Sequence, residues 1–194
     1  SLTVTNRCSD STFSDTISVL ARRTISFGSI SDVCADADTF SLGYASPSGG
    51  TYSSSATPSY ISANVFYPRW AGVGTHSIYY TYTDSFSCTS LDSTTITVLP
   101  LPNTNAGADT AICLSDTINL FPTVETNHTY SWFVGGSFLS TQTNVSVHPS
   151  TTTSYVLVDS NTISGCTNMD TITVVVDSLP AANAGLDTSI CIYD

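Results

Sequence analysis

Hydrophobic and polar residues alternate along most of this chain, which is the pattern of β-strands that bury one face. The alternation is clearest over residues 78–82, 96–98 and 172–176, where isoleucine, valine and tyrosine occupy every second position. Glycine, proline, serine and aspartate cluster between these runs, as they do in turns. No stretch carries apolar residues at helical spacing for long enough to predict a helix. The pattern therefore predicts an all-β chain.

One stretch of the sequence is repeated. Residues 105–116 (NAGADTAICLSD) return at 183–194 (NAGLDTSICIYD), 78 residues later, with eight of twelve positions identical. A cysteine, a polar turn and an alternating strand also recur, at 8–20, 88–99 and 166–175. Such recurrence indicates a tandem array of small domains. We expect four pieces: the end of a preceding repeat (1–26), two whole repeats (27–100 and 101–178) and the first strand of a following repeat (179–194).

The charge of the chain argues against several classes of partner. Of its 194 residues, 10% are charged and 41% are hydrophobic, and the formal net charge is −11. There is no lysine, and the last of the four arginines is Arg69. Nucleic-acid binding needs clustered lysine and arginine, so it is not expected. The apolar runs are too short for a membrane span, so we expect contact with a membrane only through a distant anchor.

Six cysteines indicate an oxidising compartment if they pair. Four of them fall at near-equal intervals of 54 and 53 residues, which predicts one disulfide in the same place in each repeat: Cys34–Cys88 and Cys113–Cys166. Six cysteines allow many connectivities, so this choice rests on the repeat and not on the count. Cys8 and Cys191 are left over, and we expect their partners outside this segment.

The second repeat carries a tryptophan in the place that marks an immunoglobulin-like sandwich. Trp132 lies on the expected central strand, with Cys113 before it and Cys166 after it. The first repeat has no tryptophan at the matching place, so its core must be filled in another way. We therefore expect tandem immunoglobulin-like β-sandwiches, arranged like beads on a string; the PKD-like character comes only from the resemblance described next.

Several motifs of the second repeat resemble those of a known group of repeats. They are Asn-Ala-Gly-x-Asp-Thr-x-Ile-Cys, Tyr-x-Trp at 130–132, Pro-Ser-Thr-Thr-Thr-Ser-Tyr at 149–155, and Asp-Thr-Ile-Thr-Val at 170–174. Here the chain is similar to the immunoglobulin-like and PKD-like repeats of giant surface proteins of Bacteroidota, including gliding-motility adhesins exported by the type IX system. The resemblance implies a stalk or adhesin module displayed at the cell surface, with no catalytic residues.

Sites for catalysis and for metals are sparse. The three histidines, His76, His128 and His148, belong to no metal-binding or nucleophile motif, so no enzyme is expected. The cysteines lack the Cys-x-x-Cys spacing of a zinc site. Calcium is the one candidate metal, because it takes oxygen ligands from loops, and no other cofactor is expected. Its weak candidate ligands are Asp32, Asp36 and Asp38 at one repeat junction and Asp109 with Asp116 at the next.

Aspartate followed by serine or threonine resembles the O-glycan acceptor of Bacteroidota proteins. This resemblance predicts O-glycosylation at Thr16, Thr110, Thr117, Thr171 and Ser178. The alternative is that the aspartate-threonine pairs simply begin strands.

These features together predict a non-enzymatic spacer in a long extracellular adhesin or filament. Stiff sandwiches in series would contact mainly neighbouring repeats of the same chain, with lateral association into a fibre as a further option. An alternative of a different class is a glycan- or ligand-binding module that uses exposed aromatic residues such as Tyr60, Tyr79 or Trp70. We expect Trp70, however, to pack a loop onto the sandwich. A third interpretation is an accessory region of a secreted enzyme.

Overall fold

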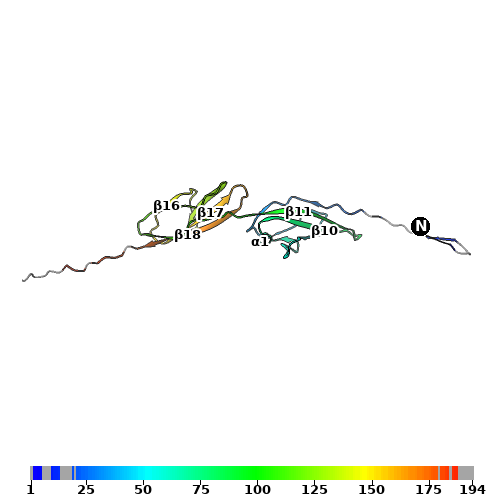
Figure 1. Ribbon diagram of the computed structural model, residues 1–194, viewed down its shortest axis with the longest axis horizontal. Coiled ribbons are helices and arrows are strands. Elements are labelled where there is room, and N and C mark those ends of the chain that lie inside the picture. Colours follow the sequence, from blue (N-terminus) through cyan, green and yellow to red (C-terminus); the bar gives the residue numbers. More distant parts are fainter. Residues whose placement is uncertain are drawn as a thin grey trace, which may run out of the picture. The chain divides into compact units, whose positions relative to one another are not determined.

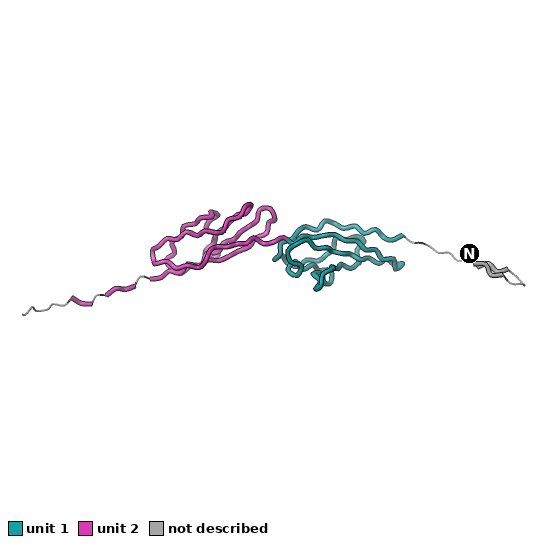
Figure 2. Tube along the Cα trace, in the orientation of Figure 1, with its two compact units in different colours: residues 1–98 teal, residues 99–194 magenta. Residues whose placement is uncertain are grey.

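The computed structural model of this chain describes residues 2–5, 10–13, 19, 21–178, 180–183 and 185–187. It divides into two compact units, Ser1–Val98 and Leu99–Asp194, drawn in teal and magenta in Figure 2. Within the described ranges, regular structure is strand except for the single helical turn α1 (Pro68–Ala71), and no helix is long and apolar enough to span a bilayer. The prediction of an all-β chain is confirmed.

A short hairpin opens the chain. Strand β1 (Leu2–Thr5) pairs antiparallel with β2 (Asp10–Phe13), so that Leu2 stands opposite Phe13. Cys8, Thr16 and Cys191 lie outside the described residues, and the roles expected for them stay predictions.

Unit 1 contains a four-stranded sheet, a three-stranded sheet and a two-stranded ribbon (Figure 1). The four-stranded sheet has the order β4 (Val33–Cys34), β11 (Thr89–Leu99), β10 (Gly74–Thr83), β7 (Thr51–Ser53). The three-stranded sheet has the order β5 (Phe40–Ser41), β9 (Val65–Phe66), β8 (Ile61–Ser62). The ribbon joins β3 (Ser26–Phe27) to β6 (Ala45–Ser46).

The core of unit 1 lies between its two larger sheets. Ile78 of β10 and Ile96 and Val98 of β11 are buried at every second position, as the alternation predicts. They join Phe66 of β9, whose side chain is fully buried, in one cluster. Two sheets that share an apolar interior in this way form a β-sandwich.

Tyrosines fill the centre of unit 1, where the sequence offers no tryptophan. The rings of Tyr52 and Tyr80 pack with centroids 4.6 Å apart. The buried hydroxyl of Tyr80 donates a hydrogen bond to the Pro47 carbonyl (2.7 Å) and accepts one from the Gly50 N–H (2.6 Å). Both hydrogen-bonding functions of the phenol are thus used, which allows a polar group to lie inside the sandwich.

Unit 2 has a five-stranded and a two-stranded sheet. The larger sheet has the order β12 (Thr110–Cys113), β18 (Thr167–Asp177), β17 (Thr153–Asn161), β14 (His128–Val134), β15 (Ser137–Ser140). The smaller one pairs β13 (Ile118–Leu120) with β16 (Val145–Val147). All neighbours are antiparallel except β12 and β18, which run parallel.

Trp132 occupies the centre of unit 2. It lies on β14 opposite Leu157 of β17, is fully buried, and shares a core cluster with Leu120 and Val145 of the smaller sheet. Its indole Nε1 has no hydrogen-bond partner, so its contribution is apolar packing. The tryptophan therefore holds the two sheets together, and the predicted immunoglobulin-like sandwich is confirmed.

Trp132→Ala should lower the free energy of unfolding of unit 2 by about 3–5 kcal/mol, the range for truncating a large aromatic core residue. Urea unfolding followed by far-UV circular dichroism measures this loss. The matched control is Trp70→Ala, because Trp70 is 64% exposed and its removal should change stability by less than about 0.5 kcal/mol. Equal losses in the two variants would contradict the central role of Trp132.

Candidate functional site

Cys113 and Cys166, the cysteines of unit 2 that the structure describes, lie at opposite ends of β18. In the parallel register, Cys113 stands opposite Asp177, the last residue of β18. Cys166 directly precedes Thr167, where β18 begins. β18 has 11 residues, which at about 3.3 Å each separate the two cysteines by roughly 35 Å. A disulfide needs Cα atoms within about 7 Å, so the predicted pair Cys113–Cys166 is wrong.

Cys34 and Cys88, the described cysteines of unit 1, are separated in the same way. The carboxylate of Asp32 accepts a hydrogen bond from the Thr97 N–H (3.1 Å), which places β4 and Cys34 near the end of β11, whereas Cys88 precedes its start. Cys34 and Cys166 are disulfide-bonded, while Cys88 and Cys113 carry free thiols. The predicted pair Cys34–Cys88 is therefore also wrong. The near-equal sequence intervals reflect two similar folds and not two close pairs.

Peptide mapping under non-reducing conditions tests this assignment. We expect no linked peptide joining Cys34 to Cys88 or Cys113 to Cys166. A thiol-specific alkylating reagent should label Cys113 in the native chain, because its side chain is free and exposed. Recovery of a Cys113–Cys166 peptide from unheated, native protein would contradict the parallel register of β12 and β18.

The repeated motif at 105–116 fastens the segment that enters unit 2 to β18. The side chain of Asn105 accepts a hydrogen bond from the Gly107 N–H (2.9 Å), and Gly107 has φ +100°, a conformation that favours glycine. Ala106, only 1% exposed, donates its N–H to the carboxylate of Asp170 (2.8 Å). The start of the motif thus forms a turn, and a hydrogen bond from its backbone to Asp170 attaches this turn to β18.

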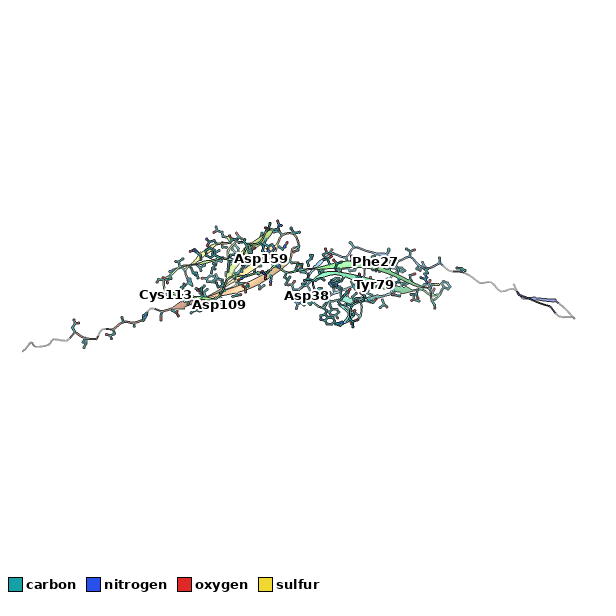
Figure 3. All side chains as sticks on the ribbon, in the orientation of Figure 1. Phe27, Asp38, Tyr79, Asp109, Cys113 and Asp159 are labelled. Carbon is teal, nitrogen blue, oxygen red and sulfur yellow. The ribbon has the colours of Figure 1, made fainter. Side chains whose placement is uncertain are left out.

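The candidate calcium ligands do not come together. Asp32 and Asp109 each cap a main-chain N–H of the neighbouring long strand, Thr97 at 3.1 Å and Thr173 at 2.8 Å. Asp38 belongs to unit 1 and Asp109 to unit 2 (Figure 3). Over the part of the chain that the structure describes, no three acidic, histidine or cysteine side chains could hold a metal ion. Asp32 and Asp109 therefore act as hydrogen-bond acceptors for strand edges.

The hydroxyls proposed for O-glycosylation differ in exposure. Thr117, Thr171 and Ser178 are exposed, and Thr110 is half-buried on β12. The aspartate before Thr171, Asp170, already binds the Ala106 N–H. Aspartate-threonine pairs thus have a structural use here, and glycosylation stays a prediction.

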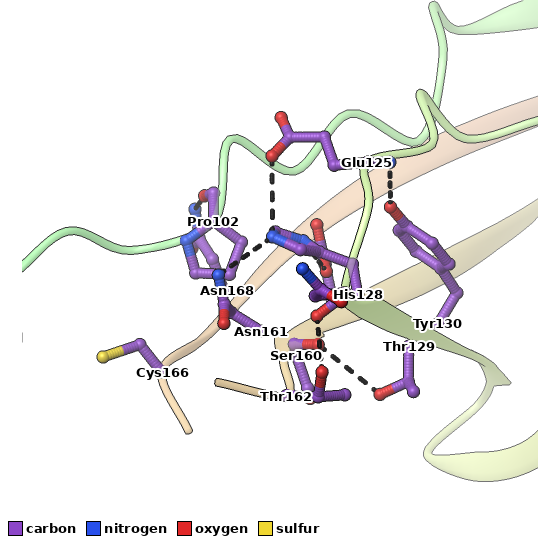
Figure 4. Close-up of polar contacts among 12 residues, drawn as sticks. Pro102, Glu125, His128, Thr129, Tyr130, Ser160, Asn161, Thr162, Cys166 and Asn168 are labelled. Carbon is purple, nitrogen blue, oxygen red and sulfur yellow. Dashed lines mark hydrogen bonds and ion pairs between the residues drawn. The ribbon is translucent and has the colours of Figure 1, made fainter. Parts of the chain in front are cut away.

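A buried polar cluster surrounds His128 on β14 (Figure 4). The ring Nδ1 lies 2.8 Å from Asp159 Oδ1, and both side chains are almost completely buried, with 4% and 2% exposure. The other ring nitrogen, Nε2, lies 3.1 Å from Asn161 Nδ2 and 3.5 Å from Glu125 Oε2. His128 belongs to no recognisable sequence motif, so only the structure reveals that its side chain is buried.

The contacts of His128 give it a structural and not a catalytic geometry. Asp159 orients the ring as the acid of a catalytic triad would. The contacts of Nε2, however, are with an amide and a carboxylate, and neither is a hydroxyl or thiol that the histidine could activate by taking its proton. The pair joins β14 to β17 at the end of unit 2 where Pro102 accepts a hydrogen bond from the Asn168 side chain (2.9 Å). Burial with partners on both ring nitrogens stabilises this end of the sandwich.

Three buried tyrosines have raised pKa values. Burial raises the pKa of Tyr155 above its usual 10.0. Burial also raises the pKa of Tyr60, which gains a further increase from Tyr79 and a decrease from its hydrogen bond to Ser77. For Tyr130, burial again dominates, opposed by the hydrogen bond from the Glu125 N–H. Each folded unit therefore favours neutral phenols.

The free energy of unfolding should fall as pH rises above about 10, because the unfolded tyrosines lose protons there while the folded ones retain them. Below that pH both states are protonated, and the full stability is present. Tyr155→Phe should flatten part of this decline in urea midpoints of unit 2 measured between about pH 8 and 11. Identical pH profiles for the variant and the native chain would show that Tyr155 does not contribute.

The aromatic residues considered for ligand binding have very different exposures. Tyr60 is buried and Tyr79 is half-buried. Trp70 is 64% exposed, and its ring stacks on Tyr67 with centroids 4.1 Å apart and planes within 8°. The expectation that Trp70 packs a loop onto the sandwich is therefore wrong. Trp70 borders a cleft of about 210 Å³.

No protein-family model and no curated protein sequence matches the chain. Among solved structures, Drosophila OTK extracellular domains 3–5 match with 12% identity over 80% of this chain and 63% of that chain, at a TM-score of 0.36. The fibronectin(III)-like modules of Clostridium thermocellum CbhA match with 9% identity over 84% and 100%, at a TM-score of 0.34. A chimeric titin Z1Z2 tandem matches with 13% identity over 53% and 65%, at a TM-score of 0.32.

The matched part is thus under two thirds of the titin and OTK chains. Likenesses at this level identify neither a family nor an activity, and the fold assignment rests on strand order and core.

Proposed function

We propose that this chain is a spacer segment of a long extracellular adhesin or filament, of the kind that the motifs at 105–116 and 170–174 resemble. The observation that best supports this proposal is that the chain enters the sandwich of unit 2 at one end and leaves it at the other. The entering segment runs alongside β18 for its whole length, through contacts in order: Pro102 to Asn168, Ala106 to Asp170, Asp109 to Thr173 and Cys113 to Asp177. β18 is the last strand of this sandwich, so the chain leaves the sandwich where β18 ends.

When the chain enters each unit at one end and leaves it at the other, every added repeat makes the array longer. At about 3.3 Å per residue, the 11 residues of β18 make one unit roughly 35 Å long. Each unit also has its own core, so that units can be added without redesigning a shared interior. These are the physical requirements of a stalk.

The start of a further repeat at 179–194 is part of this proposal. Asn183 accepts a hydrogen bond from the Gly185 N–H (2.8 Å), and Gly185 has φ +79°. The same turn opens unit 2 at Asn105 and Gly107, with a distance of 2.9 Å. The second copy of the motif thus begins with the geometry of the first, which supports a series of like units.

The location outside the cell is supported by the cysteines and the charge. Disulfide-bonded Cys34 and Cys166 suit an oxidising compartment. The net charge of −11 keeps a crowded surface protein soluble.

A length-variation experiment in the producing cells tests the spacer role. Three extra copies of residues 101–178 inserted in the native protein should move a distal gold-labelled epitope outward by roughly 100 Å in electron tomograms. The matched control replaces 101–178 with one unrelated sandwich of equal length, which should leave the epitope in place. An epitope that does not move with repeat number, or that is inaccessible to antibody on intact cells, would rule out the spacer.

A further inference from the structure

Trp70 lies on a platform in unit 1, formed by Tyr67 and the turn α1, that the spacer role does not require. The turn α1 is anchored by buried Pro68 and closed by the hydrogen bond from the Gly72 N–H to the Pro68 carbonyl (3.0 Å). Tyr67, which supports one face of the indole, donates its own N–H to the Tyr60 carbonyl (3.0 Å). The other face of Trp70 is open to solvent. A large aromatic held outward by buried neighbours is typical of binding surfaces.

Polar groups of three kinds line the cleft beside this platform. The cleft holds about 210 Å³ and is formed by Ala37, Asp38, Thr39, Tyr67, Arg69 and Trp70. The Nε and Nη2 of Arg69 donate to the Asp36 carbonyl at 3.3 and 3.0 Å, which fixes the loop carrying Asp38 against α1. Among the described residues, ion pairs occur only at His128, so Asp38 and Arg69 do not neutralise each other.

We propose that this cleft binds one neutral pyranose ring of an extracellular polysaccharide. A pyranose has a face of C–H groups, which packs on the electron-rich face of an indole. Its rim of hydroxyls both donates and accepts hydrogen bonds, which matches an acceptor (Asp38), a donor (Arg69) and a hydroxyl that does both (Thr39). The volume is below the roughly 300–1,000 Å³ of drug-sized sites, so a single ring of a longer chain fits.

Other ligands suit this geometry less well. A proline-rich peptide docks into grooves lined by aromatic residues, but here Tyr67 and Trp70 stack at 4.1 Å and leave no groove between them. A quaternary ammonium group is held by an aromatic cage, whereas Trp70 offers one open face. Acidic polymers are repelled by a chain of net charge −11. The site is independent of the spacer role, since it lies wholly within unit 1.

Titration of the whole chain with neutral hexasaccharides of glucan, mannan and xylan tests the proposal by calorimetry and tryptophan fluorescence. At least one should bind saturably and change the emission of Trp70. Trp70→Ala should weaken calorimetric binding at least about tenfold, the loss typical of truncating a central aromatic contact. Asp38→Ala should weaken it to a smaller extent, because one hydrogen-bond acceptor is lost.

Phe86→Ala is the matched control, because Phe86 is an exposed aromatic (69%) that does not line the cleft, and it should leave binding unchanged. Thermal melts of all three variants should coincide with that of the native chain, which shows that unit 1 stays folded. Absence of saturable binding to every sugar, binding that survives Trp70→Ala, or saturable binding of a decaproline peptide with no sugar binding would each overturn the proposal.

Discussion

The parallel pairing of β12 with β18 is the constraint from which the main properties of unit 2 follow. Because the two strands run the same way, the segment that enters the unit and the strand that leaves it both point toward the same end. Cys113 and Cys166 therefore lie about the length of β18 apart. The chain enters the sandwich at one end and leaves it at the other. An antiparallel pairing would have returned the chain to the end where it entered. Direction, and not strand content, makes a sandwich usable as a spacer.

Aspartates maintain this parallel edge. β12 pairs with only the last four residues of β18, so most of the entering segment has no ladder partner. Two aspartate side chains join the entering segment to β18 instead. Asp170 of β18 accepts a hydrogen bond from the Ala106 N–H, and Asp109 of the entering segment accepts one from the Thr173 N–H of β18. Asp32 does the same for Thr97 in unit 1. Asp32 and Asp109, two of the residues that the sequence offers as calcium ligands, thus accept hydrogen bonds from strand backbone.

Unit 1 and unit 2 reach the same architecture with different interiors. Unit 2 places a single indole, Trp132, between its sheets, whereas unit 1 uses phenols whose hydroxyls bind loop backbone. The phenol of Tyr80 joins the loop at Pro47 and Gly50 to the core through two hydrogen bonds. Unit 1 also carries α1 and Trp70, which border the cleft of about 210 Å³.

The sequence by itself determined the strands, the repeat and the buried faces, because a period of two and a recurring motif are local properties of the chain. Ile78, Ile96 and Trp132 are buried where alternation and the tryptophan position predict. Only the tertiary structure decided which cysteines can meet, since equal spacing does not encode whether neighbouring strands run parallel. It also decided that His128 is buried and that Trp70 is exposed. Both outcomes depend on partners from distant segments, Asp159 for His128 and Tyr67 with the loop at Asp38 for Trp70, and no local pattern records those contacts.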